Sequence, residues 1–354
     1  MVAYARVFLI VFFTLLAVFL SSLLFLLFDL SPIAGLLSLF QIGFGSRQGL
    51  ISTVGGAVPL LIVAVGLSVP FTARVWNIGG QGQFVVGSIA ATWVGLELAG
   101  TLPPGLVIIL AMFGSFLGGV AWVLPPTLMK IRLGINEVIT TLMMNFIAVF
   151  LLDYLIAGPM EGAAAAISHE PSSAPIPPSL LLPAVVPRTN IGVGLLIALL
   201  LALGLFFLLK FTRLGYELRV IGQSHDVAKY AGMPIARDIL LSTVISGGIA
   251  GIAGMVDIFG ATGILLPQVF SDITTSYGYV GIPVALIASL NPLAIIGSAI
   301  FFSGILTGTY GLELAYGIPT DVVTAVYGLV MFLAPLGVYL SLGKRRLTLA
   351  KAKQ

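Results

Sequence analysis

The chain has 354 residues, of which 59% are hydrophobic and 8% charged, with a mean hydropathy of +1.15 and a formal net charge of +3. Soluble domains carry about 25% charged residues, so this composition excludes a water-soluble fold. The absence of cysteine excludes disulfides, thiolate metal sites and a cysteine nucleophile. A spanning helix needs ~20 apolar residues, so the length allows roughly ten. We predict an all-α polytopic membrane protein of about ten transmembrane helices, some broken or short, forming a single domain over residues 1–354.

Apolar runs of bilayer length are separated by charges, prolines and loop residues. In chain order they are 7–28, 51–71, 82–100, 105–126, 136–157, 191–211, 238–260, 281–291, 292–312 and 320–342. The first run is longer than the ~7–15 residues of a signal-peptide core, so we favour a retained span over a cleaved signal. The run 281–291 is short for a ~30 Å hydrocarbon core. Residues 281–312 are therefore either two spans or a re-entrant hairpin.

The basic residues predict the orientation of these spans. If the N-terminus is cytoplasmic, every Lys and Arg except Arg47 and Arg188 lies at the cytoplasmic side. This bias is the positive-inside pattern, so we predict that both termini are cytoplasmic. The proline-rich segment 160–190 is then an irregular external loop, and 212–237 is the longest cytoplasmic loop. Membrane topology explains the positive charge, and no nucleic-acid partner is required.

The segment 76–83, Trp-Asn-Ile-Gly-Gly-Gln-Gly-Gln, places three amides and three glycines beside an apolar span. Its amides are Asn77, Gln81 and Gln83. Polar groups and broken helix are tolerated at membrane depth only inside protein or along an aqueous cavity. One interpretation is a kink beside a translocation path. The alternative is a turn that caps the next helix.

Other polar residues lie in or near the spans, among them Glu137, Asn145 and Asp257. An intramembrane polar or ionisable group is a candidate for a pathway role. Glu137 is close to the predicted interface, where solvation is cheap, and an ordinary interfacial role competes there. We add Glu137 and Asn145 to the three amides as candidates for the translocation path or its gate.

Small residues recur one helical turn apart in several spans. Examples are Gly247 with Gly251, Gly114 with Gly118, and Gly304 with Gly308. This spacing lets helix backbones approach closely. It predicts tight packing and indicates little chemistry.

A short helix is predicted inside the loop 212–237. Residues 224–226, Ser-His-Asp, include residue types that favour the start of a helix. The next five residues, 227–231, are compatible with a helix, and Gly232 and Pro234 end it. The helix is either an ordinary connector or a contact for an intracellular partner. The residues assigned to it and its ends are Asp226, Ala228, Tyr230, Gly232 and Pro234.

Three separated segments, 76–87, 136–145 and 215–222, resemble in order the permeases of sugar and nucleoside ABC importers. Residues 228–233 look like the loop that docks on the ATPase in that family, and 245–251, 277–293 and 317–323 extend the likeness to about residues 50–340. The chain most resembles the longer permease of nucleoside importers served by a basic-membrane-protein type lipoprotein. It departs from the pattern at Gln81, where the family usually has Glu, and at 287–289, where glycines are common.

This resemblance implies a permease subunit in the cell membrane that carries out no covalent chemistry itself. It implies a cytosolic ABC ATPase that binds ATP and magnesium, a second permease subunit, identical or paralogous, and an extracytoplasmic substrate-binding lipoprotein. The cargo would be a small polar metabolite, a nucleoside or a simple sugar. No lysine of the chain is followed by Ser or Thr, so the sequence has no Walker A loop and any ATPase is another chain.

Two other classes fit less well. A secondary transporter driven by an ion gradient would also show many spans, broken helices and scattered carboxylates. A membrane enzyme would need His, Asp or Glu clustered at one interface, and the sequence has no such cluster. We predict neither a metal nor a cofactor in this chain. Membrane lipid is a further expected partner.

Overall fold

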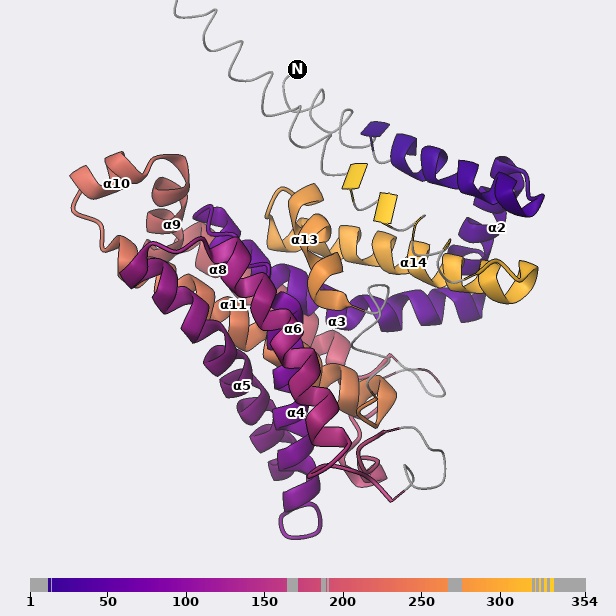
Figure 1. The fold of residues 1–354 in the computed structure, drawn as a ribbon, viewed down its shortest axis with the longest axis horizontal. Coiled ribbons are helices and arrows are strands. Elements are labelled where there is room, and N and C mark those ends of the chain that lie inside the picture. Colours follow the sequence, from indigo (N-terminus) through magenta and orange to yellow (C-terminus); the bar gives the residue numbers. More distant parts are fainter. Residues whose placement is uncertain are drawn as a thin grey trace, which may run out of the picture.

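A computed structural model describes residues 12–13, 15–163, 171–185, 189, 191–266 and 276–319, together with single residues between 322 and 333. Within these residues the fold is mostly helical, with two isolated β-bridges, Glu161 to Ser173 and Ala184 to Gly192 (Figure 1). The helices are η1 (Leu23–Phe28), α2 (Pro32–Phe44), α3 (Arg47–Thr72), α4 (Gly80–Leu98), α5 (Pro104–Leu133), α6 (Glu137–Ile156), η2 (Pro178–Leu180), α8 (Val193–Phe211), α9 (Arg213–Gln223), α10 (His225–Tyr230), α11 (Ile235–Asp257), the π-helical η3 (Ile258–Thr262), α13 (Tyr277–Ile287) and α14 (Pro292–Tyr316).

Six of these helices are long and apolar enough to cross a membrane: α3, α5, α6, α8, α11 with η3, and α14. A bent pair near the N-terminus raises the number to seven. The all-helical membrane fold is thus confirmed, but ten spans are not. The predicted runs 82–100 and 281–291 do form helices, α4 and α13, yet neither is among the six. Almost all of the predicted run 320–342 falls outside the described residues.

The N-terminal region differs from the prediction. The segment Leu15–Phe28 is followed by α2 at a bend of 111°, and the sequence analysis did not predict α2. Its start is nevertheless encoded locally, because Ser31 Oγ accepts a hydrogen bond from Ala34 N at 3.2 Å and Pro32 occupies the first helical position. Helix α5 is also longer than predicted, since it continues to Leu133 through two prolines.

Helices α3 and α11 form the centre of the bundle. Their apolar windows are 67% and 72% buried, against 28% for α5, α6 and α8. The last three therefore turn most of their apolar surface outward, as helices facing lipid or another subunit do. Helix α11 packs against α4 and α5 through small residues. Gly87 lies against Gly251, and Gly119 against the backbone of Gly247, so a side chain there would collide. The predicted packing role of these glycines is confirmed.

The two ends of the bundle differ in charge. Helices α3, α5 and α8 end, and α6, α9 and α11 begin, around two cavities at one end (Figure 1), which we call the basic end. Its cations are Arg74, Lys130, Arg132, Lys210, Arg213, Arg219, Lys229 and Arg237. The segment 160–190 precedes α8 and the segment 212–237 follows it, so they lie at opposite ends of that span. In the 160–190 segment, Leu182 N donates to Phe259 O at 2.7 Å.

Candidate functional site

The first candidate region is the break between α3 and α4. Helix α3 ends at Thr72, Arg74 adopts a left-handed backbone conformation with φ of 58°, and α4 begins at Gly80. The predicted amides of this segment are buried, with about 1% of Asn77, Gln81 and Gln83 exposed. Buried amides need hydrogen-bond partners, because an unpaired one costs about 1–3 kcal/mol.

Asn77 and Gln83 pair with each other inside the break. Asn77 Nδ2 donates to Gln83 Oε1 at 3.1 Å, and Gln83 Nε2 donates to Asn77 Oδ1 at 2.9 Å. Asn77 also bonds to Ser246 Oγ of α11 at 3.2 Å and accepts from Gly79 N at 3.1 Å. The pair therefore fixes the irregular backbone and ties it to the central helix. The N-cap residue of α4, Gly79, has no capping side chain of its own.

Helix α6 supplies the partners for the rest of the break. Asn145 Oδ1 accepts from Gly82 N at 2.8 Å, and its Nδ2 donates to Ile78 O at 3.0 Å. Thr141, one turn earlier, accepts from Ile78 N at 3.2 Å. These two side chains satisfy backbone groups that no helix pairs, which is the condition for interrupting a helix within a membrane. The sequence analysis missed Thr141, although its i, i+4 spacing from Asn145 was a usable signal.

Gln81 connects the break to α13. Its Oε1 accepts from Gly278 N at 2.9 Å, and Gly278 lies so close to the Gln81 backbone that no side chain would fit there. The first turns of α4 and the short helix α13 are therefore in direct contact. The sequence around Gln81 does not predict a hydrogen bond to Gly278, which is 197 residues away.

Glu137 lies beside this network, at the basic end. Its carboxylate pairs with Lys130 Nζ at 2.7 Å and accepts from Trp76 N at 3.3 Å. Between Glu137 and Asn77 is a cavity of only about 10 Å³, which is about the space of one water molecule. The structure thus brings all five predicted gate candidates to the same region. Asn77 pairs with Gln83, Asn145 and Gln81 bond to backbone groups in and beside the break, and Glu137 is adjacent. We call these four amides and their partners the amide network. In this conformation the network is packed and closed to a metabolite.

The second candidate region is the segment 212–237 at the basic end. In α9, Leu218 and Ile221 are buried, and Gly222 packs on the carbonyl of Thr72. Arg213 Nε donates to the buried carboxylate of Glu217 at 2.7 Å, and this hydrogen bond raises the pKa of Arg213. Helix α9 is therefore held against the end of α3.

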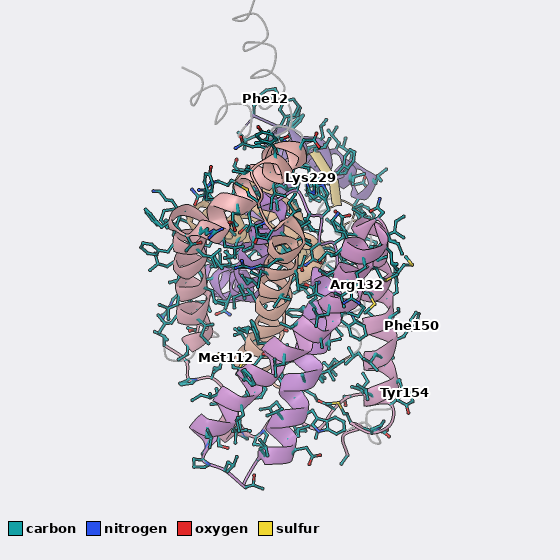
Figure 2. All side chains as sticks on the ribbon, turned by 90° about the vertical axis from the view of Figure 1, so that its left-hand side faces the viewer. Phe12, Met112, Arg132, Phe150, Tyr154 and Lys229 are labelled. Carbon is teal, nitrogen blue, oxygen red and sulfur yellow. The ribbon has the colours of Figure 1, made fainter. Side chains whose placement is uncertain are left out.

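The predicted short helix is confirmed as α10, with Asp226 in its first turn. Ser224 Oγ accepts from Val227 N at 3.3 Å, and Gly232 ends the segment with φ of 67° before Pro234 leads into α11. Ala228 is completely buried, so its side chain packs inside this chain. Tyr230, in contrast, is 96% exposed. Figure 2 shows neighbouring Lys229 at this end of the molecule and Tyr154 near the opposite end.

A family model described as branched-chain amino acid transport system / permease component matches residues 49–335. The glucose ABC transporter permease protein TsgB13 of Haloferax volcanii is 28% identical over 81% of this chain and 76% of its own. The guanosine ABC transporter permease protein NupP of Bacillus subtilis is 28% identical over 88% of both chains. The nucleoside ABC transporter permease protein NupB of Lactococcus lactis is 28% identical over 88% and 86%. No solved structure matches.

The matched residues 49–335 include both candidate regions and, apart from the first two residues of α3, the six helices that could cross a membrane. The resemblance stated from the segments 76–87, 136–145 and 215–222 is thereby confirmed. Multiple apolar helices and the family match together identify a multi-pass membrane protein. The chain belongs to the family of ABC transport system permease components.

Proposed function

We propose that this chain is the membrane-spanning permease subunit of an ATP-driven importer, with its basic end in the cytoplasm and both termini on that side. An extracytoplasmic binding lipoprotein would deliver the cargo to the opposite end. A second permease subunit would complete the path, and a cytosolic ATPase, which binds ATP and magnesium, would drive the cycle. The cationic loops of the basic end support this orientation.

The exposed side of α10 is the observation that carries the proposal. The helix is anchored to its own chain through Ala228, yet it presents Tyr230 and Val227, which are 96% and 57% exposed. An aromatic side chain on a short, anchored helix is suited to a pocket on a partner, because tyrosine supplies contact area at low entropic cost. Val227 and Tyr230 are therefore the contact residues. Asp226, Gly232 and Pro234 would shape the helix, and Ala228 would hold it in place.

We also propose that the amide network is part of the gate. A broken helix is more easily rearranged than a continuous one, and the break contacts α13 directly through Gln81 and Gly278. Movement of α13 relative to α4 would separate these two groups and open the packed region. Asn77, Gln83 and Asn145 would hold the break itself, while Glu137 would fix it to the end of α5.

For the cargo, we propose a nucleoside or a simple sugar. The relatives named for guanosine and nucleosides align over 88% of this chain, and the relative named for glucose over 81%. All these molecules carry many hydroxyl groups and lack the fixed charge that would require a countercharge along the path.

Uptake by the assembled importer tests the proposal. Cells or proteoliposomes that contain this chain, its second permease, lipoprotein and ATPase are supplied with labelled guanosine or glucose. We expect uptake to require ATP hydrolysis by the partner and to survive collapse of the proton and sodium gradients at constant ATP. Uptake by this chain alone that follows an ion gradient would refute the proposal and support an ion-coupled transporter.

A further inference from the structure

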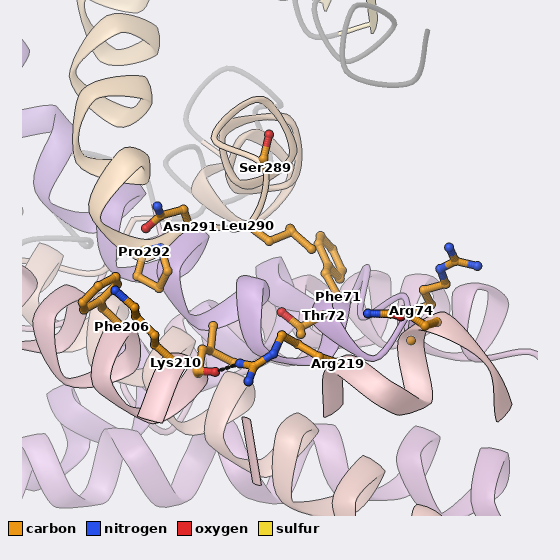
Figure 3. Close-up of a pocket in the computed structure, with 13 residues that line it drawn as sticks. Phe71, Thr72, Arg74, Phe206, Lys210, Arg219, Ser289, Leu290, Asn291 and Pro292 are labelled. Carbon is orange, nitrogen blue, oxygen red and sulfur yellow. Dashed lines mark hydrogen bonds between the residues drawn. The ribbon is translucent and has the colours of Figure 1, made fainter. Parts of the chain in front are cut away.

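The larger cavity at the basic end lies beside α8 and α9, and none of the four network amides lines it. Its volume is about 590 Å³, and it is bounded by the ends of α3 and α8, by α9, and by the turn between α13 and α14 (Figure 3). Three cations line it: Arg74 after α3, Lys210 in the last turn of α8, and Arg219 in α9. None of its lining residues is acidic. The cavity therefore has the charge of an anion site.

Two of the cations are held in position. Arg219 donates a hydrogen bond to the carbonyl of Leu209 near the end of α8, and a guanidinium retains further donors after one bond. Lys210 Nζ lies 5.0 Å from the centre of the Phe206 ring and 5.2 Å from that of Phe211, which is the range of a cation–π contact. No ion pair neutralises any of the three cations within the described part of the chain.

The backbone around this cavity is unusual. Four non-glycine residues in the described ranges have positive φ, and three of them line it: Arg74 at 58°, Ser289 at 55° and Leu290 at 61°. Each follows the end of a helix, where glycine is the usual residue for this conformation. The left-handed region is sterically unfavourable for any residue with a Cβ, because the Cβ comes too close to the following carbonyl oxygen. Such strain, concentrated at one cavity, is characteristic of a functional site.

On the side of α3 and α8, part of the lining is apolar and belongs to membrane-spanning helices. Phe206 and Leu209 are in the last turns of α8, a helix whose outward residues, such as Leu200 and Phe207, are exposed. The cavity thus lies where the apolar surface of α8 gives way to the cationic end. A headgroup lies at this depth when its acyl chains follow the adjacent helix.

We propose that this cavity binds the phosphate group of an anionic phospholipid, whose acyl chains extend along α8. Arginine and lysine bind phosphate oxygens through charge-assisted hydrogen bonds, and basic pockets between spanning helices suit lipid headgroups of the cytoplasmic leaflet. The lipid would join α3, α8, α9 and the α13–α14 turn. The lipid would therefore contact the ends of α3 and α13, the same helices that flank the amide network.

The test uses the full chain, purified in detergent after incorporation in vesicles of mixed phosphatidylglycerol and phosphatidylcholine. Native mass spectrometry measures the lipid that each variant retains. We expect the wild type to retain phosphatidylglycerol selectively, and Lys210→Gln and Arg74→Asn each to reduce retention about fivefold. Asn is chosen at position 74 because it tolerates the left-handed conformation.

Arg132→Gln is the matched control, because Arg132, like Lys210, is an exposed cation in the last turn of a spanning helix but does not line the cavity. It should retain lipid as the wild type does. Unchanged retention in the Lys210→Gln/Arg74→Asn double variant would overturn the proposal, as would equal retention of phosphatidylcholine. Displacement of the lipid by millimolar inorganic phosphate would instead indicate a free-phosphate site.

Discussion

The segment 76–83 and helix α10 both lie between longer helices of the bundle, yet their surroundings are opposite. In the break, Asn77, Gln81 and Gln83 are buried and bonded to groups from α6, α11 and α13. In α10, Tyr230 is 96% exposed and a side chain at Gly232 would meet nothing within 4 Å. The first segment is completed by its own chain, whereas the second leaves its surface open to another molecule. Substitutions should therefore act on folding in the break and on assembly in α10.

The largest loss of stability is expected for Asn145→Leu. It removes the acceptor for Gly82 N and the donor for Ile78 O, and each orphaned buried group costs about 1–3 kcal/mol. Thermal unfolding in detergent should shift downward and the yield of monodisperse protein should fall. Thr141→Val removes a single acceptor, that for Ile78 N, and should lose less. Equal stability of wild type and Asn145→Leu would show that the break does not depend on α6.

Gln81→Leu should lower uptake more than it lowers yield. It leaves Gly278 N without the acceptor that Gln81 supplies, and it disconnects α4 from α13 at the proposed gate. Gln81→Glu keeps an oxygen that can accept from Gly278 and should preserve most of the uptake. Initial uptake rates, normalised to protein in the membrane, measure the effect. Uptake kinetics unchanged in Gln81→Leu would remove Gln81 from the gate.

Gly232→Val should uncouple the importer with a small loss of stability. The position has φ of 67° and open space around it, so the substitution is opposed by backbone conformation, at roughly 1–2 kcal/mol, and by no collision. Gly232→Asn tolerates that conformation and should behave nearly as wild type. Co-purification with the ATPase and cargo-stimulated ATP hydrolysis are the measurements. Normal values for Gly232→Val would make α10 a connector.

Tyr230→Ala should have the smallest effect on the isolated chain and still weaken the complex. Its side chain is almost wholly exposed, so the thermal unfolding temperature should not change. Loss of an aromatic anchor from an interface typically costs more than 1 kcal/mol of binding, which would reduce ATPase affinity at least fivefold. Retained affinity would contradict the proposed contact. A lowered unfolding temperature would contradict the contrast between α10 and the break.

Local signals made much of this predictable. The runs between charges predicted α6 and α8 to within two residues and α3 to within four, because apolar length is what a bilayer selects. Ser224 and Gly232 marked the ends of α10 by their cap chemistry. Helix α2 was not predicted, although Ser31 and Pro32 are typical start residues. At 13 residues it is shorter than the apolar runs of bilayer length from which spans were predicted.

The partners in the amide network could not be predicted in the same way. Ser246 is 169 residues from Asn77, and Gly278 is 197 residues from Gln81. These contacts follow from how α11 and α13 pack, which depends on glycines at several helix crossings at once. The sequence could show that three amides in an apolar region need partners. It could not show that two of them pair with each other.

The π-helical turn η3 continues α11 as far as the 160–190 segment. The carbonyl of Phe259, within η3, accepts a hydrogen bond from Leu182 of the 160–190 segment. At its other end α11 follows Pro234, just beyond α10. A helix of 23 residues is about 35 Å long, so α11 is a rigid rod with a loop attached at each tip. The segment that carries α10 and the 160–190 segment are therefore joined through a single helix, one at each end.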